Sequence, residues 1–298
     1  MFCLFHISRK HELPSCPPPF REYMEMMRIS NVRVGLELLL IKYNDFSQEF
    51  QQLSRGLLWF RCSNFEHRYI PSWLSLDNIR VLELTSPESL ETLWEEAHPP
   101  LQLRELLIKY ASILQSLPRS IGHLKHLKRL SLVDTGMVPL SSLPEEFCLL
   151  HSLEHLSLEA CPELSRLSNH FGDLVNVRHL NLLFCRSLEM LPVSFKKLIN
   201  LEYLKLSYCQ KLTLKSDILE NITKLEIFDV LHCYKFKKLP HNITKQSFLR
   251  KLYISNTKSL IELPVYTGQL TKLDELKIVE CPLLTRLPTS LGKLPTVI

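Results

Sequence analysis

The chain has 298 residues, of which 45% are hydrophobic and 22% are charged, with only 7 glycines and 18 prolines. This composition supplies an extensive apolar core and excludes collagen-like and low-complexity sequences. The net charge of +5 arises from 36 basic and 31 acidic side chains whose signs alternate along the chain, which favours a mixed solvated surface over a nucleic-acid-binding groove.

The first 30 residues do not follow the pattern of the rest of the chain. Their apolar stretch, Phe2 to Phe5, is short and precedes the charges of Arg9 and Lys10, the reverse of the order in a secretory signal peptide. The prolines at 14 and 17–19 predict a stiff, extended stretch. We therefore interpret residues 1–30 as a non-repeat N-terminal segment or linker.

A repeat begins after this segment. Residues 31–53 hold a degenerate unit, with Leu36, Leu38 and Ile41 on strand spacing. Residues 54–298 then divide into about ten units that start at 54, 79, 103, 127, 153, 177, 201, 225, 249 and 273. Most steps are 24 residues, and the step of 26 after 127 indicates an insertion around Val138 to Ser141. Such spacing is typical of a solenoid, in which each unit packs on its neighbours.

Each unit carries apolar residues at positions one, four, six and twelve, and a cysteine or another small residue at position nine. In one unit these are Leu201, Leu204, Leu206, Leu212 and Cys209. Positions four and six are two residues apart, so their side chains share one face of a strand. This is the pattern of leucine-rich repeats, and it predicts an α/β solenoid, a horseshoe with a parallel β-sheet on its concave face.

The second half of each unit is also regular. A Leu-Pro pair recurs at positions fifteen and sixteen, as at 191–192, and a glycine recurs at position twenty, as at Gly172. Proline opens a helical turn without needing its N–H, and glycine either ends the turn or permits a close approach. We expect short helices or 3-10 turns on the convex face, with an irregular loop where Lys215 and Ser216 replace Leu-Pro.

Most cysteines have a structural interpretation. Six of the nine are assigned to position nine, where threonine and alanine substitute for them: Cys62, Cys161, Cys185, Cys209, Cys233 and Cys281. Adjacent units bring some of them within bridging distance, but parallel side chains and a reducing compartment argue against disulfides. The C-x-x-C spacing of zinc sites is absent. No phosphate-binding loop or nucleophile–base set occurs either, so we predict a non-enzyme without cofactor or metal.

The end of the chain interrupts a unit. A further repeat would begin at Val297, and no polar cap follows. Because the open end of a solenoid core needs a cap, we expect an array truncated at its C-terminus. No run approaches 18 apolar residues, so no membrane contact is expected, and a cytoplasmic or nuclear location is the default.

The concave face is the expected binding surface for a protein partner, since its variable residues occupy positions three, five, seven and eight. Over the units at 177 to 249 these positions are rich in aromatic and charged side chains, as at protein-binding patches. The predicted partner-binding residues are His179, Leu183, Phe184, Tyr203, Lys205, Tyr208, Asp229, Leu231, His232, Lys251 and Tyr253. Alternatively, Phe184 and Tyr208 pack against the turn beside them.

Three segments resemble plant intracellular nucleotide-binding leucine-rich-repeat (NLR) immune receptors: 117–130 (LPRSIGHLKHLKRL), 185–192 (CRSLEMLP) and 287–294 (LPTSLGKL). The resemblance covers about residues 54–298. In that family the repeat domain packs on a nucleotide-binding module and holds the receptor inactive. It also recognises a pathogen effector or a guarded host protein, after which the module exchanges ADP for ATP and oligomerises.

The resemblance therefore implies a sensor and autoinhibitory domain that acts in plant disease resistance and innate immunity. The implied partners are a pathogen effector, a guarded host protein or an intramolecular nucleotide-binding module. Two alternatives remain, namely the substrate-recognition array of a ubiquitin-ligase adaptor and a stand-alone leucine-rich-repeat scaffold. An adaptor needs an N-terminal docking module longer than 1–30, and a receptor ectodomain needs a signal peptide and cysteine-paired caps.

Overall fold

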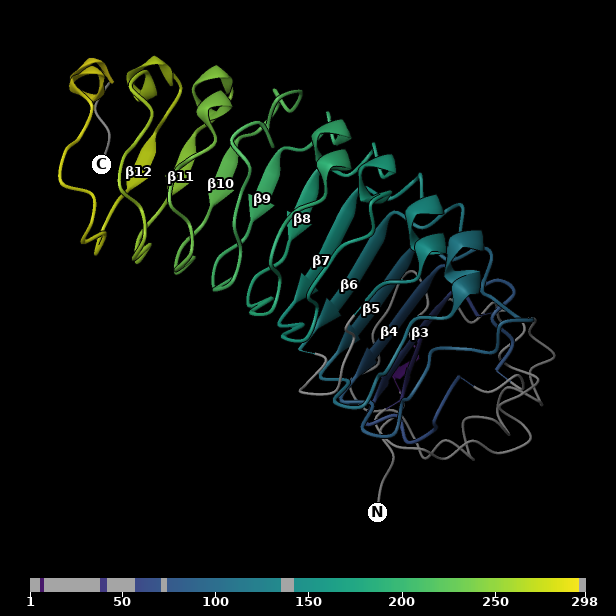
Figure 1. Ribbon diagram of the computed structural model, residues 1–298. Helices are drawn as coiled ribbons and strands as arrows, with labels where there is room; N and C mark the ends of the chain where they lie inside the picture. Colours follow the sequence, from purple (N-terminus) through teal and green to yellow (C-terminus); the bar gives the residue numbers. More distant parts are fainter. Residues whose placement is uncertain (1–5, 8–37, 42–56, 71–73, 135–141, 295–298) are drawn as a thin grey trace, which may run out of the picture.

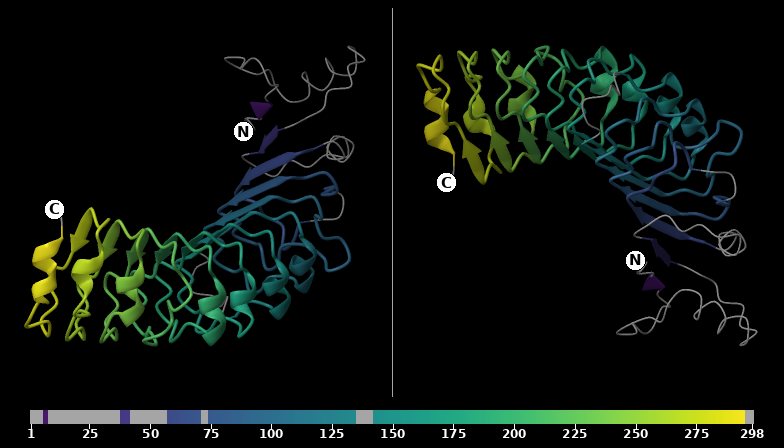
Figure 2. Two further views of the ribbon diagram at one scale, coloured as in Figure 1. Left: turned by 90° about the horizontal axis from the view of Figure 1, so that it is seen from above. Right: turned by 90° about the horizontal axis from the view of Figure 1, so that it is seen from below.

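The computed structural model describes residues 6–7, 38–41, 57–70, 74–134 and 142–294. These residues form a leucine-rich-repeat solenoid in which the strands line the inner side of a curve and short 3-10 helices line the outer side (Figures 1 and 2). The predicted insertion around Val138 to Ser141, the prolines at 14 and 17–19, and the interrupted unit at Val297 lie outside the described residues.

One sheet of twelve strands runs through the described residues in sequence order. The strands are β1 His6–Ile7, β2 Leu38–Ile41, β3 Trp59–Ser63, β4 Val81–Thr85, β5 Glu105–Lys109, β6 Arg129–Val133, β7 His155–Glu159, β8 His179–Asn181, β9 Tyr203–Lys205, β10 Ile227–Asp229, β11 Lys251–Tyr253 and β12 Glu275–Lys277. From β2 to β12 each strand pairs in parallel with the next, and β1 pairs antiparallel with β2. Each unit therefore forms one rung, and this confirms the predicted solenoid.

The register of β3 corrects the predicted start of the first full unit. Phe60 pairs with Leu82, which occupies position four of its own rung. Phe60 thus occupies position four and Cys62 position six, so the rung begins at residue 57 and not at 54. The assignment of Cys62 to the cysteine position was wrong. Trp59 and Cys62 match the spacing of positions six and nine by chance. The pairing of Phe60 with Leu82, together with the complete burial of Phe60, identifies Phe60 as the core residue of the strand.

The degenerate unit at 31–53 contributes β2. Leu39 lies opposite Phe60, so Leu39 occupies the position-four site of this rung. The strand includes Leu38 and Ile41, two of the three residues expected on strand spacing. The third, Leu36, lies outside the described residues.

The core is a column of buried side chains that continues from rung to rung. At positions one, four, six and twelve of a central rung, Leu201, Leu204, Leu206 and Leu212 are at most 1% exposed. Burial of each such side chain contributes about 1.5–3 kcal/mol. The leucines of neighbouring rungs supply the covering surface, so a rung is stabilised mainly by the rungs on either side of it.

Position eight turns the chain out of the strand through left-handed backbone in ten successive rungs. The residues, all with φ between 50° and 62°, are Asn64, Ser86, Tyr110, Asp134, Ala160, Phe184, Tyr208, His232, Asn256 and Glu280. Left-handed backbone costs a non-glycine residue about 1–2 kcal/mol. The N–H at this position stays within the inter-rung ladder, as in the 2.9 Å bond from the Phe184 N–H to the Ser207 carbonyl. The turn therefore changes the chain direction without losing a hydrogen bond.

The cysteines at position nine form a ladder behind this turn. The buried thiols of Cys185, Cys209 and Cys233 each donate, at 3.1 Å, to the position-six carbonyl of the preceding rung. All three are free thiols. Burial raises the pKa of each thiol, to about 12 for Cys233. A small side chain with a weak donor suits this site, which explains why position nine is so often cysteine.

The outer side of the curve carries seven 3-10 helices among the described residues, as expected for short turns. They are η1 Arg119–His123, η2 Glu145–Leu149, η3 Phe171–Asp173, η4 Val193–Lys197, η5 His241–Lys245, η6 Thr267–Gln269 and η7 Thr289–Lys293. Proline directly precedes five of them, with φ near −60°. The predicted role of the Leu-Pro pair in opening the turn is confirmed.

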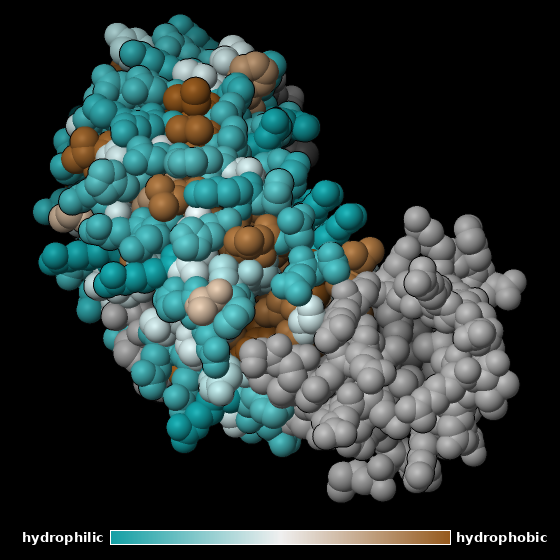
Figure 3. Space-filling view, turned by 90° about the vertical axis from the view of Figure 1, so that its right-hand side faces the viewer, coloured by the Kyte–Doolittle hydropathy of each residue, from teal (hydrophilic) through white to brown (hydrophobic). Residues whose placement is uncertain are grey.

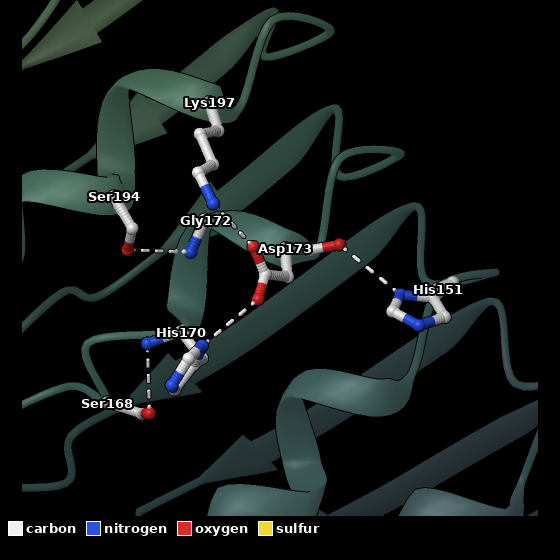
Figure 4. A network of polar contacts seen from close by, with 7 residues as sticks. All are labelled: His151, Ser168, His170, Gly172, Asp173, Ser194 and Lys197. Atoms are coloured by element: carbon white, nitrogen blue, oxygen red, sulfur yellow. Dashed lines mark hydrogen bonds and ion pairs between the residues drawn. The ribbon is translucent and has the colours of Figure 1, made fainter.

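Glycine at position twenty permits a close approach between rungs. A Cβ at Gly172 would lie 1.8 Å from the carbonyl oxygen of Ser194. The Gly172 N–H donates to the Ser194 hydroxyl at 3.0 Å (Figure 4). Because Gly172 lies inside η3, it does not end the turn. Close approach, one of the two predicted roles, is therefore the one observed.

Polar contacts join the rungs at the same place. Lys197 donates to the Asp173 carboxylate at 2.9 Å, and His170 lies 3.3 Å from its other oxygen (Figure 4). The Lys197 hydrogen bond is the main cause of the lowered pKa of Asp173. Exposed pairs such as Lys197 with Asp173 contribute at most about 1 kcal/mol each. Hydrophilic side chains cover most of the face in Figure 3, with hydrophobic ones in small groups among them.

We predict that Gly172→Ala lowers the free energy of unfolding by about 1–3 kcal/mol, because the added methyl group must displace the Ser194 backbone. Gly292→Ala is the matched control, since a Cβ there meets no atom within 4 Å, and its effect should stay within about 0.5 kcal/mol. Urea denaturation followed by circular dichroism measures both. Equal stability of the two variants would refute the close-packing explanation.

A second prediction concerns thiol reactivity. Alkylation by iodoacetamide requires a thiolate, so Cys185, Cys209 and Cys233 should stay unmodified in the native protein at neutral pH. Cys281 occupies the same position in the last described rung, where it is half-exposed, and it should react first. Peptide mass spectrometry after quenching measures each site, and alkylation in denaturant serves as the control. Native labelling of Cys209 as fast as that of Cys281 would contradict the buried ladder.

Candidate protein-binding surface

The predicted partner-binding residues occupy neighbouring rungs on the strand side of the solenoid. Leucines at positions four and six face the core, so positions three and five of β8 to β11 face the concave side. The predicted residues that are half-buried at these positions are His179, Tyr203, Lys205, Lys251 and Tyr253. They lie in register across consecutive strands, so the structure brings them together as one surface.

Three rings at position three stack along this face and form the inner ring ladder: His155, His179 and Tyr203. The ring centroids of His155 and His179 are 4.4 Å apart, and those of His179 and Tyr203 are 5.9 Å apart. His155 was missed in the sequence. The repeat pattern could have identified it, because His155 occupies position three of the rung that precedes that of His179.

A shallow hollow of about 290 Å³ lies beside the inner ring ladder. Its lining includes Arg129, Ser157 and Asn181. Partial burial is the main cause of the lowered pKa of His155, and the nearby His179 and Arg129 lower it further. Partial burial thus favours the neutral form of His155. The hollow offers a partner both hydrogen-bonding groups and flat ring surface.

A second row of rings follows the C-terminal ends of β8, β9 and β10. The edge ring ladder consists of Phe184, Tyr208 and His232, all half-buried and all at the left-handed position eight. The Phe184 and Tyr208 centroids are 4.2 Å apart, as are those of Tyr208 and His232. The Arg186 guanidinium lies 5.7 Å from the Phe184 ring centroid. The rings thus stack chiefly on one another, and Arg186 is the contact that Phe184 makes with its own turn.

Small polar groups lie between the two ladders. Asn181 donates to the Ser157 hydroxyl at 3.2 Å and to the Glu159 carboxylate at 2.9 Å. Its own side-chain oxygen accepts the Leu183 N–H at 3.0 Å, so Leu183 is held at the end of β8. Lys205, half-buried in the next strand, brings a positive charge to this row.

Asp229 differs from the other predicted contact residues. It is only 6% exposed, and its carboxylate accepts the Ser207 hydroxyl and the Leu231 N–H. These bonds join the ends of β9 and β10. Asp229 therefore orients the strand ends and the half-buried Leu231 beside them, and it presents little surface to a partner.

The C-terminal border of the surface is charged. The Tyr253 hydroxyl donates to the Glu275 carboxylate at 2.7 Å, and Lys251 lies 3.6 Å from the same carboxylate. Burial and this hydrogen bond raise the pKa of Tyr253 to about 12. Both residues are therefore already engaged with Glu275, and a partner would meet them as an ordered polar group.

Two further findings bear on chemistry. Among the described residues, no group of three or more histidine, cysteine, aspartate or glutamate side chains could hold a metal ion. Within the same residues, no helix is long and apolar enough to cross a membrane.

Comparison with known proteins identifies the fold. No protein-family description matches the chain, and no curated protein matches it. A solved leucine-rich-repeat protein of Leptospira interrogans is 23% identical over 87% of this chain and 82% of that chain, with a TM-score of 0.54. The leucine-rich-repeat domain of the type III effector XopL is 24% identical over 82% and 76%, with a TM-score of 0.55.

A TDR receptor is 20% identical, with a TM-score of 0.55, over 86% of this chain and 49% of the receptor. This chain therefore spans about half of that receptor. At these identities the likeness extends to the repeat architecture alone. The chain has the leucine-rich-repeat fold.

Proposed function

We propose that this leucine-rich-repeat chain recognises a protein partner through the surface between its inner and edge ring ladders. The observation that carries the proposal is the stacking of six rings in two parallel rows across adjacent rungs. Tyrosine is among the residues enriched in binding hot spots, and the ladders contain Tyr203 and Tyr208. Because these rings are already held by their neighbours, binding would lose little side-chain entropy.

We further propose that the partner interaction belongs to plant intracellular immunity. The support for this is the likeness of segments 117–130, 185–192 and 287–294 to plant NLR receptors. In this proposal the ring ladders contact a pathogen effector, a guarded host protein or the nucleotide-binding module of the same receptor. The chain then serves as the sensor and autoinhibitory part, and it contributes binding rather than catalysis.

The double substitution Phe184→Ala with Tyr208→Ala tests the surface. We expect partner affinity to fall by roughly 10- to 100-fold, because two stacked rings leave the contact surface. Folding should remain intact, since Ala160 occupies the same left-handed position in another rung with φ of 54°. Quantitative capture from a tissue extract, followed by titration of the purified partner, gives the affinity.

The matched control is Tyr69→Ala with Phe248→Ala. It also removes two exposed aromatic rings, but from positions thirteen and twenty-four, outside the strands. This control should bind as the unsubstituted chain does. Unchanged affinity in the Phe184→Ala, Tyr208→Ala variant, with unchanged thermal unfolding, would rule out the edge ring ladder as the contact surface.

The immune-receptor proposal has a separate test in the transcript. Sequencing through both ends should find a contiguous upstream reading frame that encodes the phosphate-binding loop G-x-x-x-x-G-K-[ST], because a nucleotide-binding module needs this loop to hold phosphates. A transcript that starts at Met1, with no such frame, would instead favour a stand-alone repeat scaffold.

A further inference from the structure

A hollow of about 610 Å³ lies on the lateral side of the solenoid, between the strand ends and the outer 3-10 helices. We call it the lateral groove. It spans the rungs that begin at 201, 225 and 249, and its lining includes Thr213, Leu214, Lys235, Lys237, Lys238 and Ile261. No residue of the two ring ladders lines it, so it is separate from the concave surface.

The groove coincides with a local break in the repeat. Most rungs bury a leucine at position fifteen, as at Leu191 and Leu239, which are 2% and 4% exposed. In the rung at 201 this position holds the exposed Lys215. Residues 216–221 form turns there and not a 3-10 helix. Leu214, the residue before Lys215, is half-buried at the edge of the groove, whereas its counterparts Met190 and Lys238 are exposed.

The backbone of the lateral side is also interrupted at the groove. Elsewhere the N–H at position thirteen donates to the same position in the preceding rung, as from Thr213 to Glu189 at 2.9 Å and from Ile261 to Lys237 at 3.1 Å. Among the described residues the corresponding bond is missing between Lys237 and Thr213, and also between Thr285 and Ile261 in the last rung. The β-bridge between Met190 and Thr213 thus continues the lateral ladder up to Thr213, and the ladder is interrupted before Lys237.

The charges of the groove are predominantly positive. Lys238 pairs with Glu262 at 2.6 Å, and Glu262 is the only carboxylate in the lining. Within the described residues, neither Lys235 nor Lys237 has an ion-pair partner, and both are exposed. Beside them Ile261 is 45% exposed. The groove therefore combines two lysines without an ion-pair partner among the described residues, an interrupted backbone ladder and an apolar contact.

We propose that the lateral groove binds an extended acidic peptide segment of a partner protein. Its carboxylates meet Lys235 and Lys237, and an apolar side chain contacts Leu214 and Ile261. An extended peptide can also lie along the lateral side where the ladder between Thr213 and Lys237 is interrupted, as in other extended-peptide sites. A membrane surface does not fit into a hollow.

Fluorescence anisotropy with the full chain tests this proposal. The probe is a labelled ten-residue peptide of aspartate and glutamate with two central leucines, and its amide analogue with asparagine and glutamine is the peptide control. We expect saturable binding of the acidic probe only. Lys235→Glu with Lys237→Glu should weaken it by roughly tenfold or more, because unlike charges are replaced by like charges.

Three further measurements sharpen the result. Lys224→Glu with Lys272→Glu makes the same charge change at position twenty-four, away from the groove, and should bind like the unsubstituted chain. Ile261→Ser should weaken binding without changing net charge. Binding to vesicles of anionic phospholipid is measured in parallel by sedimentation.

Loss of probe binding in the Lys235→Glu, Lys237→Glu variant but not in its control supports the lateral groove. Absence of saturable probe binding to the unsubstituted chain overturns the proposal, as does equal weakening by both lysine pairs. Vesicle binding that depends on Lys235 and Lys237 without probe binding would replace the peptide with a membrane surface. None of these results depends on Phe184 or Tyr208, so they leave the concave-face proposal independent.

Discussion

The structure depends on one constraint: each rung must cover the leucines of the rung before it while returning the chain to the same place. The parallel ladder sets the spacing of neighbouring strands at about 4.8 Å, and every other contact has to fit that spacing. Gly172 meets the next backbone at a distance that no side chain could occupy. The thiol of Cys209 reaches the carbonyl of the preceding rung for the same reason.

The same constraint connects the fold to its candidate binding surface. Position eight must turn the chain while keeping its N–H in the ladder, so ten non-glycine residues adopt left-handed backbone. The cost of about 1–2 kcal/mol for each is offset by burial of the whole rung. Because the turn recurs in register, Phe184, Tyr208 and His232 lie directly above one another and stack. The obligatory turn at position eight thus places these three rings in an ordered row.

Departures from the repeat have the opposite effect. Where Lys215 replaces the position-fifteen leucine, the outer helix is absent, a lateral hydrogen bond is missing and a hollow opens. Local rules of a fold are most often broken where a protein performs its function. The repeat and its local departure thus produce two different kinds of surface, a row of stacked rings and a cationic groove, with no lining residue in common.

The sequence by itself determined the repeat, its length, the buried leucines, the role of the Leu-Pro pair and the side of the sheet on which the predicted partner-binding residues of the strands lie. These features follow from the periodic spacing of side-chain types along the sequence. Only the tertiary structure decided the register of the first rung, the burial of Asp229, the stacking of His155 on His179 and the opening of the lateral groove. Each of these depends on contacts between rungs, about 24 residues apart, that spacing within a unit does not encode.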